Sequence, residues 1–450
     1  MATTKKPSQL RHDAAQGGPA TTRPTPPPAQ PAATPSSATT RHATHAPEVF
    51  AFLVQLGVAL LATGDAVSDI EHRLLQAAKA YGQPDARVMV LPTAVLVAGD
   101  GGAATLATHD GMSSTELRLD QVTAVLNLAA AAGKGELSPA EGRRRLGQVH
   151  TMPNRHTPLV AALGYVIVTL GVGLVIRPSV ELLPLYLALG SLVALLRAGA
   201  ARVVGMRSIL PVIAAAAVSA IAFKVYPAAP LQAVIPALVV FLPGGLLTMA
   251  TVDLASDEVV TGSTRFVAGL LQLALLAVGI VLGARLVGVV PSSHSPTAAH
   301  LLGWWAPWLG VLVFGLGTGL EESAPLRSLP WLLLVLYTAW AGQLLGAAVL
   351  GPLLSGFVGG LVVAPLATLI ERFPSAPPAL VSFLPAFWML VPGSLGLIGV
   401  TQLVGDSTAA GATTFTNALV SVVAIALGIL VGLRALNLIK EAGDTARAHL

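Results

Sequence analysis

Two stretches of the chain repeat each other 149 residues apart, and they decide the fold. Residues 236–270 read PALVVFLPGGLLTMATVDLASDEVVTGSTRFVAGL, and residues 385–419 read PAFWMLVPGSLGLIGVTQLVGDSTAAGATTFTNAL. About a third of the aligned positions are identical without a gap, including a Pro-Gly pair at 243–244 and at 392–393. Apolar composition alone would not place Pro-Gly, Asp and Gly at one common offset. The pattern therefore predicts an internal duplication.

The composition is that of a membrane protein. Of 450 residues, 54% are apolar and only 11% are charged, and the mean hydropathy is +0.73. Ordinary soluble domains carry about 25% charged residues, so this chain needs lipid to cover most of its surface. The net charge of +4 does not indicate a nucleic-acid partner, because no Lys/Arg run is interleaved with aromatic residues. The chain has no cysteine, which excludes disulfides, thiolate metal sites and cysteine nucleophiles.

The first 156 residues differ from the rest. Residues 1–46 are rich in Pro, Thr, Ala and Ser and lack an apolar run, which predicts a disordered tail. Residues 47–156 predict a small cytoplasmic α+β domain with helices over 48–62, 66–81 and 120–132 and strands over 88–97 and 104–108. A last helix should follow the capping box Ser138-Pro139-Ala140-Glu141. The charged residues of this N-terminal domain form no catalytic or metal-binding motif, so we expect the protein to be neither an enzyme nor the carrier of a cofactor.

Ten apolar segments follow, which we interpret as spans of a hydrocarbon core about 30 Å thick. They cover residues 159–176, 182–196, 210–225, 231–250, 264–290, 304–320, 331–350, 352–370, 380–400 and 415–436. The predicted fold is an all-α polytopic membrane region of two five-helix halves, 157–290 and 301–437. A cytoplasmic tail, residues 438–450, ends the chain.

The basic residues predict the orientation of the spans. With the N-terminus inside the cell, thirteen Lys and Arg residues from Arg143 onward fall on the inner side, and only Arg177, Lys224 and Arg285 fall outside. Such an excess is typical of cytoplasmic loops. Both termini are therefore expected in the cytoplasm. Because each half has five spans, the two halves should have opposite orientations, as in the inverted repeats of secondary transporters.

The Pro-Gly pairs predict a break in the fourth span of each half. Proline removes a backbone donor and clashes with the preceding turn, and glycine permits non-helical angles. The freed backbone groups need a partner in lipid, and a bound substrate or water could supply it. A proline kink satisfied by neighbouring helices is the alternative. The matching positions of the breaks favour a substrate site, whose predicted contacts are Pro243, Gly244, Gly245, Thr248, Pro392, Gly393 and Ser394.

Acidic residues near the breaks are candidates for proton coupling, because charge is costly within a membrane. Asp253 lies about two to three helical turns beyond the first break and is the leading candidate, although its repeat mate is Gln402. Asp257 and its mate Asp406 follow the two breaks and are further candidates. Glu321, at the end of the sixth span, belongs to the same group of charges near the membrane.

Two groups of residues carry a resemblance to a known family. They are Gly64, Glu71, Gly82 and Leu91-Pro92-Thr93 in the N-terminal segment, and Pro243-Gly244, Asp253, Gly262 and Val391-Pro392-Gly393-Ser394 in the apolar region. With these residues the chain resembles the threonine/serine exporter family of the bacterial inner membrane. The resemblance implies ten spans, a cytoplasmic N-terminal domain, and export of L-threonine and L-serine driven by the proton gradient. Some split relatives are associated with dicarboxylate export.

Three functions remain open. The leading one is a proton-coupled exporter of small hydroxy amino acids in contact with membrane lipid, and the oligomeric state is left open. Export of a small dicarboxylate such as succinate would need basic residues at the midplane, where Arg265 is the nearest. An intramembrane hydrolase would draw its two aspartates from separate helices, whereas Asp253 and Asp257 lie four residues apart.

Overall fold

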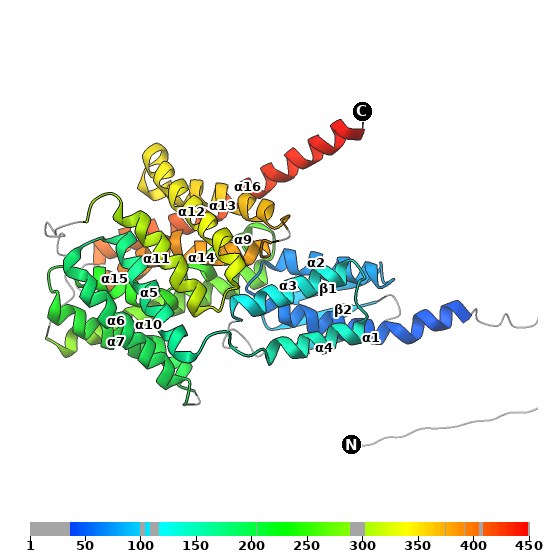
Figure 1. The fold of residues 1–450 in the computed structure, drawn as a ribbon, viewed down its shortest axis with the longest axis horizontal. Coiled ribbons are helices and arrows are strands. Elements are labelled where there is room, and N and C mark those ends of the chain that lie inside the picture. Colours follow the sequence, from blue (N-terminus) through cyan, green and yellow to red (C-terminus); the bar gives the residue numbers. More distant parts are fainter. Residues whose placement is uncertain are drawn as a thin grey trace, which may run out of the picture. The chain divides into compact units, whose positions relative to one another are not determined.

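Helices make up most of the chain, as its apolar composition predicts. The computed structural model describes residues 37–99, 104–108, 117–203, 205–288, 302–373, 375–390, 392–404 and 408–448. From His45 onward these residues form one compact unit. Figure 1 shows the order of the elements along the chain.

Seven of the described helical segments are long and apolar enough to cross a membrane. Three of them begin with a short 3-10 helix. The segments are α5 (Pro158–Ile176), η1 (Val180–Leu182) with α6 (Leu183–Ala200), α7 (Met206–Val225), α10 (Val259–Leu286), η3 (Leu326–Ser328) with α12 (Leu329–Leu350), η4 (Pro352–Leu354) with α13 (Ser355–Ile370), and α16 (Thr408–Ala448).

Two further apolar segments are bent pairs of helices. In the first pair, α8 (Pro230–Ala237) leads through η2 (Val239–Phe241) to α9 (Gly244–Ala255), with a bend of 68°. In the second pair, α14 (Ala379–Leu390) leads to α15 (Pro392–Val404), with a bend of 42°. If each pair is one span, the described residues contain up to nine spans. The first bend lies between Ala237 and Val239, ahead of Pro243, and α9 begins only after this proline. The second bend lies between Leu390 and Leu395, which includes Pro392-Gly393. Broken helices in these two segments are confirmed, although the first bend precedes its Pro-Gly pair.

The predicted sixth span is shorter than the others. It corresponds to α11 (Ala306–Glu321), an apolar helix of 16 residues. A helix of that length extends about 24 Å, against a hydrocarbon core of about 30 Å. Ten spans therefore remain a prediction.

Glycines allow α5 and α11 to cross at close range. A Cβ added to Gly164 would lie 2.6 Å from the backbone nitrogen of Glu321, and one added to Gly317 would lie 2.6 Å from that of Val168. Gly171 lies equally tightly against the backbone of Phe314. Small residues let membrane helices approach in this way, which increases their dispersion contacts. Because α5 and α11 begin the two predicted halves, this crossing joins one half to the other.

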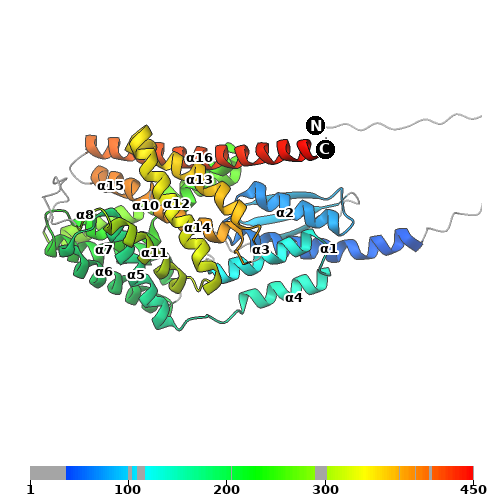
Figure 2. The ribbon, with the colours of Figure 1, turned by 45° about the horizontal axis from the view of Figure 1, so that its top comes forward.

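Corresponding helices of the two predicted halves form corresponding pairs. Helix α7 packs against α10, and α13 packs against α16. Between the predicted halves, α10 packs against α15 and α16 packs against α9. Figures 1 and 2 show α5, α6, α7 and α10 together, and α12 and α13 beside α16.

The N-terminal segment, residues 47–156, contains helices and a three-stranded antiparallel sheet. Its helices are α1 (Ser37–Leu61), α2 (Val67–Ala80), α3 (Leu119–Gly133) and α4 (Pro139–His150), close to the predicted ranges. Helix α1 begins within the predicted tail, and residues 1–36 of that tail lie outside the described chain. The N-cap Ser138 accepts a hydrogen bond from the Glu141 amide at 3.2 Å, which confirms a cap at the start of α4.

The sheet corrects one prediction. Its order is β1 (Arg87–Leu91), β2 (Ala94–Ala98) and β3 (Ala104–Thr108), so the single strand predicted over 88–97 is wrong. Pro92 and Thr93 form a turn that pairs Leu91 with Ala94. Proline has a fixed φ and no amide hydrogen for the ladder, so it ends a strand. The hairpin turn expected at residues 99–102 lies mostly outside the described residues.

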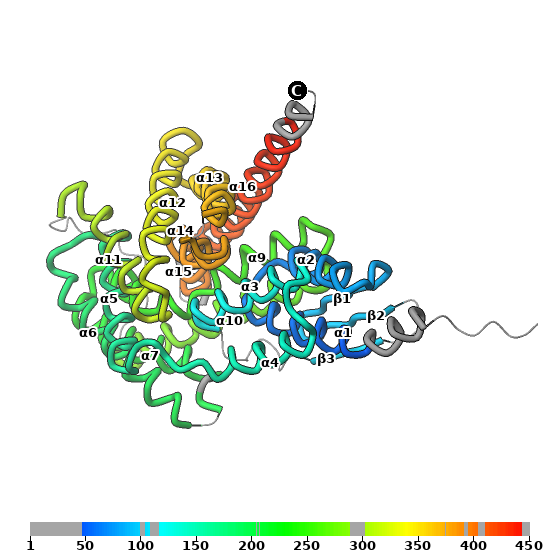
Figure 3. The backbone as a smooth tube through the Cα atoms, turned by 45° about the vertical axis from the view of Figure 1, so that its right-hand side comes forward, coloured from blue at the N-terminus to red at the C-terminus, as the bar shows by residue number. Residues whose placement is uncertain are grey.

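Helix α1 supplies the centre of the N-terminal segment. Phe52, Leu53 and Leu56 are fully buried. Gly57 lies against Val95 of β2 and Leu74 of α2. Figure 3 shows the strands beside α1. The apolar face of α1 is therefore covered by its own segment, and burial of this face stabilises the segment by the hydrophobic effect.

Candidate functional site

The first break joins two buried helix ends. Helix α8 ends at Ala237, and Pro243 occupies the N-cap position of α9, where no side chain caps the helix. Pro243 and Gly244 are buried and Gly245 is partly buried. Because proline cannot donate to the preceding turn, α9 begins here as a new helix after the 3-10 helix η2.

Side chains satisfy two backbone carbonyls at the first break. The hydroxyl of Tyr165 in α5 donates to the carbonyl of Ala237. The amide of Gln272 in α10 donates to the carbonyl of Phe241 at 2.7 Å. Both donors are protein groups, so these two carbonyls do not require a substrate as their partner. A lone glutamine in an apolar helix is the sequence signal that could have identified Gln272.

Thr248 is the one predicted substrate contact of the first break with a hydroxyl group. It is fully buried, and its hydroxyl donates to the carbonyl of Gly244 at 2.9 Å within α9. That bond occupies the donor and leaves the oxygen lone pairs for a ligand.

The second break is supported from a different helix. The amide of Gln343 in α12 donates to the carbonyl of Leu390, the last residue of α14, at 3.4 Å. Pro392, Gly393 and Ser394 form the start of α15, and their side chains lie outside the described part of the chain.

The structure brings the two breaks together. A Cβ added to Gly245 would lie 3.7 Å from the Cβ of Phe387, which is one turn before the end of α14. In α15, the helix after the second break, Gly396 lies against Leu273 of α10. Gly245 of the first break therefore contacts α14, the helix that leads to the second break.

Asp253 has a different environment from the one expected for a free proton carrier. Its side chain is fully buried, and its Oδ2 pairs with Nη1 of Arg265 at 2.7 Å. Its Oδ1 accepts a hydrogen bond from the backbone amide of Val67 at 3.1 Å, and Arg265 also donates to the carbonyl of Asp65 at 2.9 Å. Val67 is the first residue of α2, whose own N-cap, Ala66, has no capping side chain. Asp253 therefore caps α2 and attaches the N-terminal segment to α9 and α10.

Asp65 is a second buried acid at this contact. Its Oδ1 accepts a hydrogen bond from the amide of Ala66 at 3.0 Å, and Oδ2 lies 3.7 Å from Nε of Arg73. Burial, together with the charge of Asp69, raises the pKa of Asp65 to about 7. Burial also raises the pKa of Asp69.

The other two proton-coupling candidates are placed differently. Asp257 is exposed in the turn between α9 and α10, with φ of 65°. Glycine, asparagine and aspartate adopt this left-handed conformation more readily than other residues do. Asp406 lies outside the described residues. The structure thus does not bring Asp257 to the breaks.

A second ion pair, between a partly exposed arginine and a buried glutamate, connects the two predicted halves. Nη1 of Arg197, in the last turn of α6, pairs with Oε1 of Glu321 at the end of α11. The guanidinium of Arg197 also lies 5.0 Å from the ring centroid of Tyr165. Sequence reasoning noted Glu321 as a charge near the membrane and used Arg197 only for orientation. Their pairing has no sequence signal, because 124 residues separate them.

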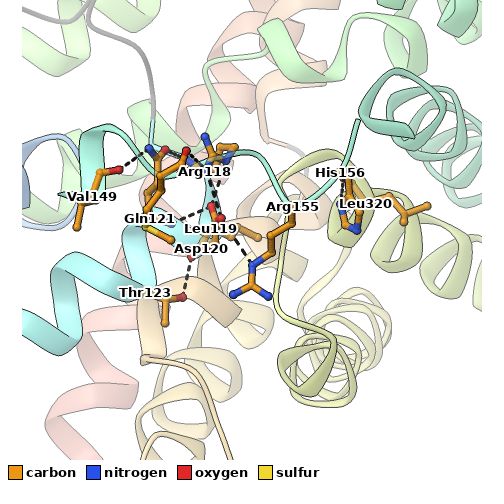
Figure 4. A network of polar contacts seen from close by, with 10 residues as sticks. Arg118, Leu119, Asp120, Gln121, Thr123, Val149, Arg155, His156 and Leu320 are labelled. Atoms are coloured by element: carbon orange, nitrogen blue, oxygen red, sulfur yellow. Dashed lines mark hydrogen bonds and ion pairs between the residues drawn. The ribbon is translucent and has the colours of Figure 1, made fainter. Parts of the chain in front are cut away.

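The N-terminal segment also contacts the end of α11. The amide of Leu119 donates to the carbonyl of Glu322 at 3.2 Å. The ring of His156 lies with Nδ1 3.1 Å from the carbonyl of Leu320, and Figure 4 shows this contact. Asp120, almost fully buried, pairs with Arg118 at 3.1 Å, and this pair anchors the start of α3. The segment is therefore attached to both predicted halves.

These features define a multi-pass membrane protein with broken apolar helices and buried ion pairs. No cluster of three His, Asp or Glu residues that could hold a metal occurs in the part of the chain that the structure describes. Residues 51–287 match a protein family described as a threonine/serine exporter. The match covers more than half of the 450 residues, so the chain belongs to this family of membrane exporters.

Two curated fungal proteins are similar to part of the chain. Pheromone-regulated membrane protein 10 of Eremothecium gossypii is 23% identical over 222 residues, and the protein of that name from Candida albicans is 26% identical over 222 residues. Each match covers 45% of this chain, but only 30% and 20% of the fungal proteins. The chain thus matches less than a third of the length of these relatives. No solved structure matches it.

Proposed function

We propose that this protein exports L-threonine and L-serine across the bacterial inner membrane, driven by the proton gradient, with both termini in the cytoplasm. The observation that carries the proposal is the contact of two broken apolar helices, at Gly245 and Phe387, in a member of an exporter family. Transporters commonly bind substrate where helices are interrupted near the membrane midplane.

The proposal includes an inverted repeat of two five-helix halves, and glycine contacts that recur at the offset of the sequence repeat support it. Gly262 of α10 lies against Leu254 of α9, and Gly411 of α16 lies against Leu403 of α15. Both residues of the second contact lie 149 residues after those of the first, the offset of the sequence repeat. Two further pairs of glycines are related by the same offset. Gly279 and Gly283 of α10 pack against α7, and their repeat mates Gly428 and Gly432 of α16 pack against α13. Two halves that pack alike can exchange conformations during alternating access.

The proposed substrate contacts are at the two breaks. They comprise Pro243, Gly244, Gly245, Thr248, Pro392, Gly393 and Ser394. The free lone pairs of Thr248 can accept a hydrogen bond from an ammonium or hydroxyl group. Proton coupling requires a carboxylate, for which the sequence offers Asp253, Asp257 and Asp406.

Transport by the full-length protein in sealed liposomes tests this function. Vesicles loaded with labelled L-threonine should release it when a proton gradient is imposed, and unlabelled serine should compete. Absence of gradient-dependent flux of threonine and of serine would contradict the proposal. Competition by succinate but not by serine would assign the protein to dicarboxylates instead.

The choice among the carboxylates needs matched variants. Asp253→Asn changes a fully buried acid, whereas Asp257→Asn changes an exposed acid of the same α9–α10 region. If Asp253 carries the proton, its variant should lose gradient-driven efflux and keep exchange of labelled for unlabelled threonine. Gradient-driven efflux that survives in the Asp253 variant would exclude it as the carrier.

A further inference from the structure

In the ion pair of Arg197 and Glu321, one carboxylate oxygen has no hydrogen-bond partner among the described residues. Glu321 has a side chain that is only 5% exposed, and its Oε1 is paired with Arg197. Its other oxygen, Oε2, is buried and has no hydrogen-bond partner among the described residues. A buried carboxylate oxygen without a donor is unfavourable, so a ligand that supplies a donor would be stabilised there.

The partner of Glu321 is accessible. The side chain of Arg197 is 34% exposed, and it is held between the carboxylate and the ring of Tyr165. A guanidinium has five donor hydrogens, and its planar fork matches a carboxylate. The pair therefore places a partly exposed cationic group beside a buried anionic group at one end of α6 and α11.

This arrangement matches the charges of an α-amino acid. We propose that the ion pair of Arg197 and Glu321 is a binding site for zwitterionic amino acids, in which Arg197 binds the carboxylate, Glu321 binds the ammonium, and a proton competes with that ammonium. The inference rests on the proposed export function, and it assigns to Glu321 the coupling step that the sequence assigned to Asp253.

Because the substrate ammonium and a proton compete for the carboxylate of Glu321, the protein would exchange one substrate molecule for one proton. Ionised Glu321 binds the ammonium, and the occupied site carries no net charge, as the empty ion pair does. Protonated Glu321 has no charge with which to hold an ammonium, so the amino acid leaves and the site carries one positive charge. A proton entering from outside therefore replaces an amino acid leaving the cell. No covalent bond to the substrate forms or breaks.

The site is connected to the first break through one residue. Tyr165 contacts Arg197 with its ring, and its hydroxyl donates to the carbonyl of Ala237, where α8 ends. Movement of Arg197 towards a substrate carboxylate changes its contact with this ring. The occupancy of the ion pair can thereby influence the bend between α8 and α9.

Few other charges adjoin Glu321. Its neighbours from α5 and α6 are Tyr165 and Arg197. Glu322 follows it in the chain, and His156 from the segment between α4 and α5 contacts the carbonyl of Leu320. The ion pair of Asp253 is less suited to substrate, because both of its oxygens already accept hydrogen bonds from Val67 and Arg265.

Equilibrium binding of labelled L-threonine to the purified full-length protein in nanodiscs tests the site. Across the acidic range in which Glu321 is protonated, the dissociation constant of the wild type should rise roughly tenfold for each unit that the pH falls, with one proton released per threonine bound. Glu321→Gln should bind threonine at least about a hundredfold more weakly and without proton release, since it loses a charge-assisted contact. Glu371→Gln, which changes an exposed carboxylate at the end of α13, is the control and should keep both properties.

The outcomes separate this inference from the export function. Proton release that persists in Glu321→Gln, while the wild type transports threonine, overturns the site but leaves the export function. If Glu321→Gln does not fold, the double variant Arg197→Gln with Glu321→Gln has no unpaired buried charge and must show the same loss. If the wild type fails with threonine and serine but binds alanine with proton release, the hydroxy amino acid substrate is wrong and the site stands. Absence of binding for all three amino acids overturns both.

Discussion

The attachment of the N-terminal segment to α9 and α10 should depend on the pair of Asp253 and Arg265. Replacing Asp253 with Asn leaves the guanidinium of Arg265 buried without a counter-ion, since that residue is only 8% exposed. Breaking a buried pair from one side costs about 3–5 kcal/mol. An asparagine oxygen can still cap α2, whereas Asp253→Ala also removes the acceptor for the amide of Val67 and should cost about 1 kcal/mol more.

A double-mutant cycle isolates the pair. The variant that combines Asp253→Asn with Arg265→Gln has no unpaired charge, so it should be more stable than the sum of the single changes predicts, with a coupling energy of about 2–3 kcal/mol. Hydrogen exchange of the α2 amides in the full-length protein measures the local opening free energy. A loss of about 3 kcal/mol corresponds to exchange roughly a hundredfold faster. Single variants that each cost less than about 1 kcal/mol and add without coupling would refute the reasoning.

Three further predictions concern other parts of the molecule. The pKa of Asp65 is raised from 3.8 to about 7, so between these pH values the folded protein retains a proton that the unfolded chain has lost. Attachment of α2 should therefore weaken as the pH rises towards 7. Asp65→Asn should flatten this pH dependence, as measured by hydrogen exchange of the α2 amides. Gly171→Leu should disrupt the crossing of α5 and α11 and lower the thermal stability in detergent, whereas Gly199→Leu, with no atom within 4 Å of its Cβ, should leave it unchanged. Gln343→Leu removes the 3.4 Å donor to the carbonyl of Leu390 together with a buried amide oxygen that has no partner among the described residues, so it should destabilise the protein by no more than about 1 kcal/mol, and a larger loss would contradict this balance.

Much of the fold could be predicted because its signals are local. Apolar runs identified the long helices, and the Pro-Gly pairs identified the two segments that bend, since proline and glycine act on their own backbone. The first bend nevertheless lies at Leu238, ahead of Pro243. The wrong prediction of a single strand across Pro92 also came from a local signal. The apolar, β-branched residues on both sides read as one strand, and the turn at proline was overlooked.

The site was predicted only in part. The sequence located the two breaks, but not the side chains that satisfy them, because Tyr165, Gln272 and Gln343 come from other helices. Asp253 was recognised as a costly charge, yet its role in capping α2 depends on Val67, 186 residues away. No pattern within either helix reveals such a partner.

The sequence by itself determined that this chain has long apolar helices and which two apolar segments are broken, and it predicts that its two halves are related. These properties follow from hydrophobicity, from the backbone restrictions of proline and glycine, and from the repeat. Only the tertiary structure decided which charges meet. Arg197 pairs with Glu321 across 124 residues because the glycines of α5 let α11 approach closely, and side chains on separate helices become neighbours only when those helices pack.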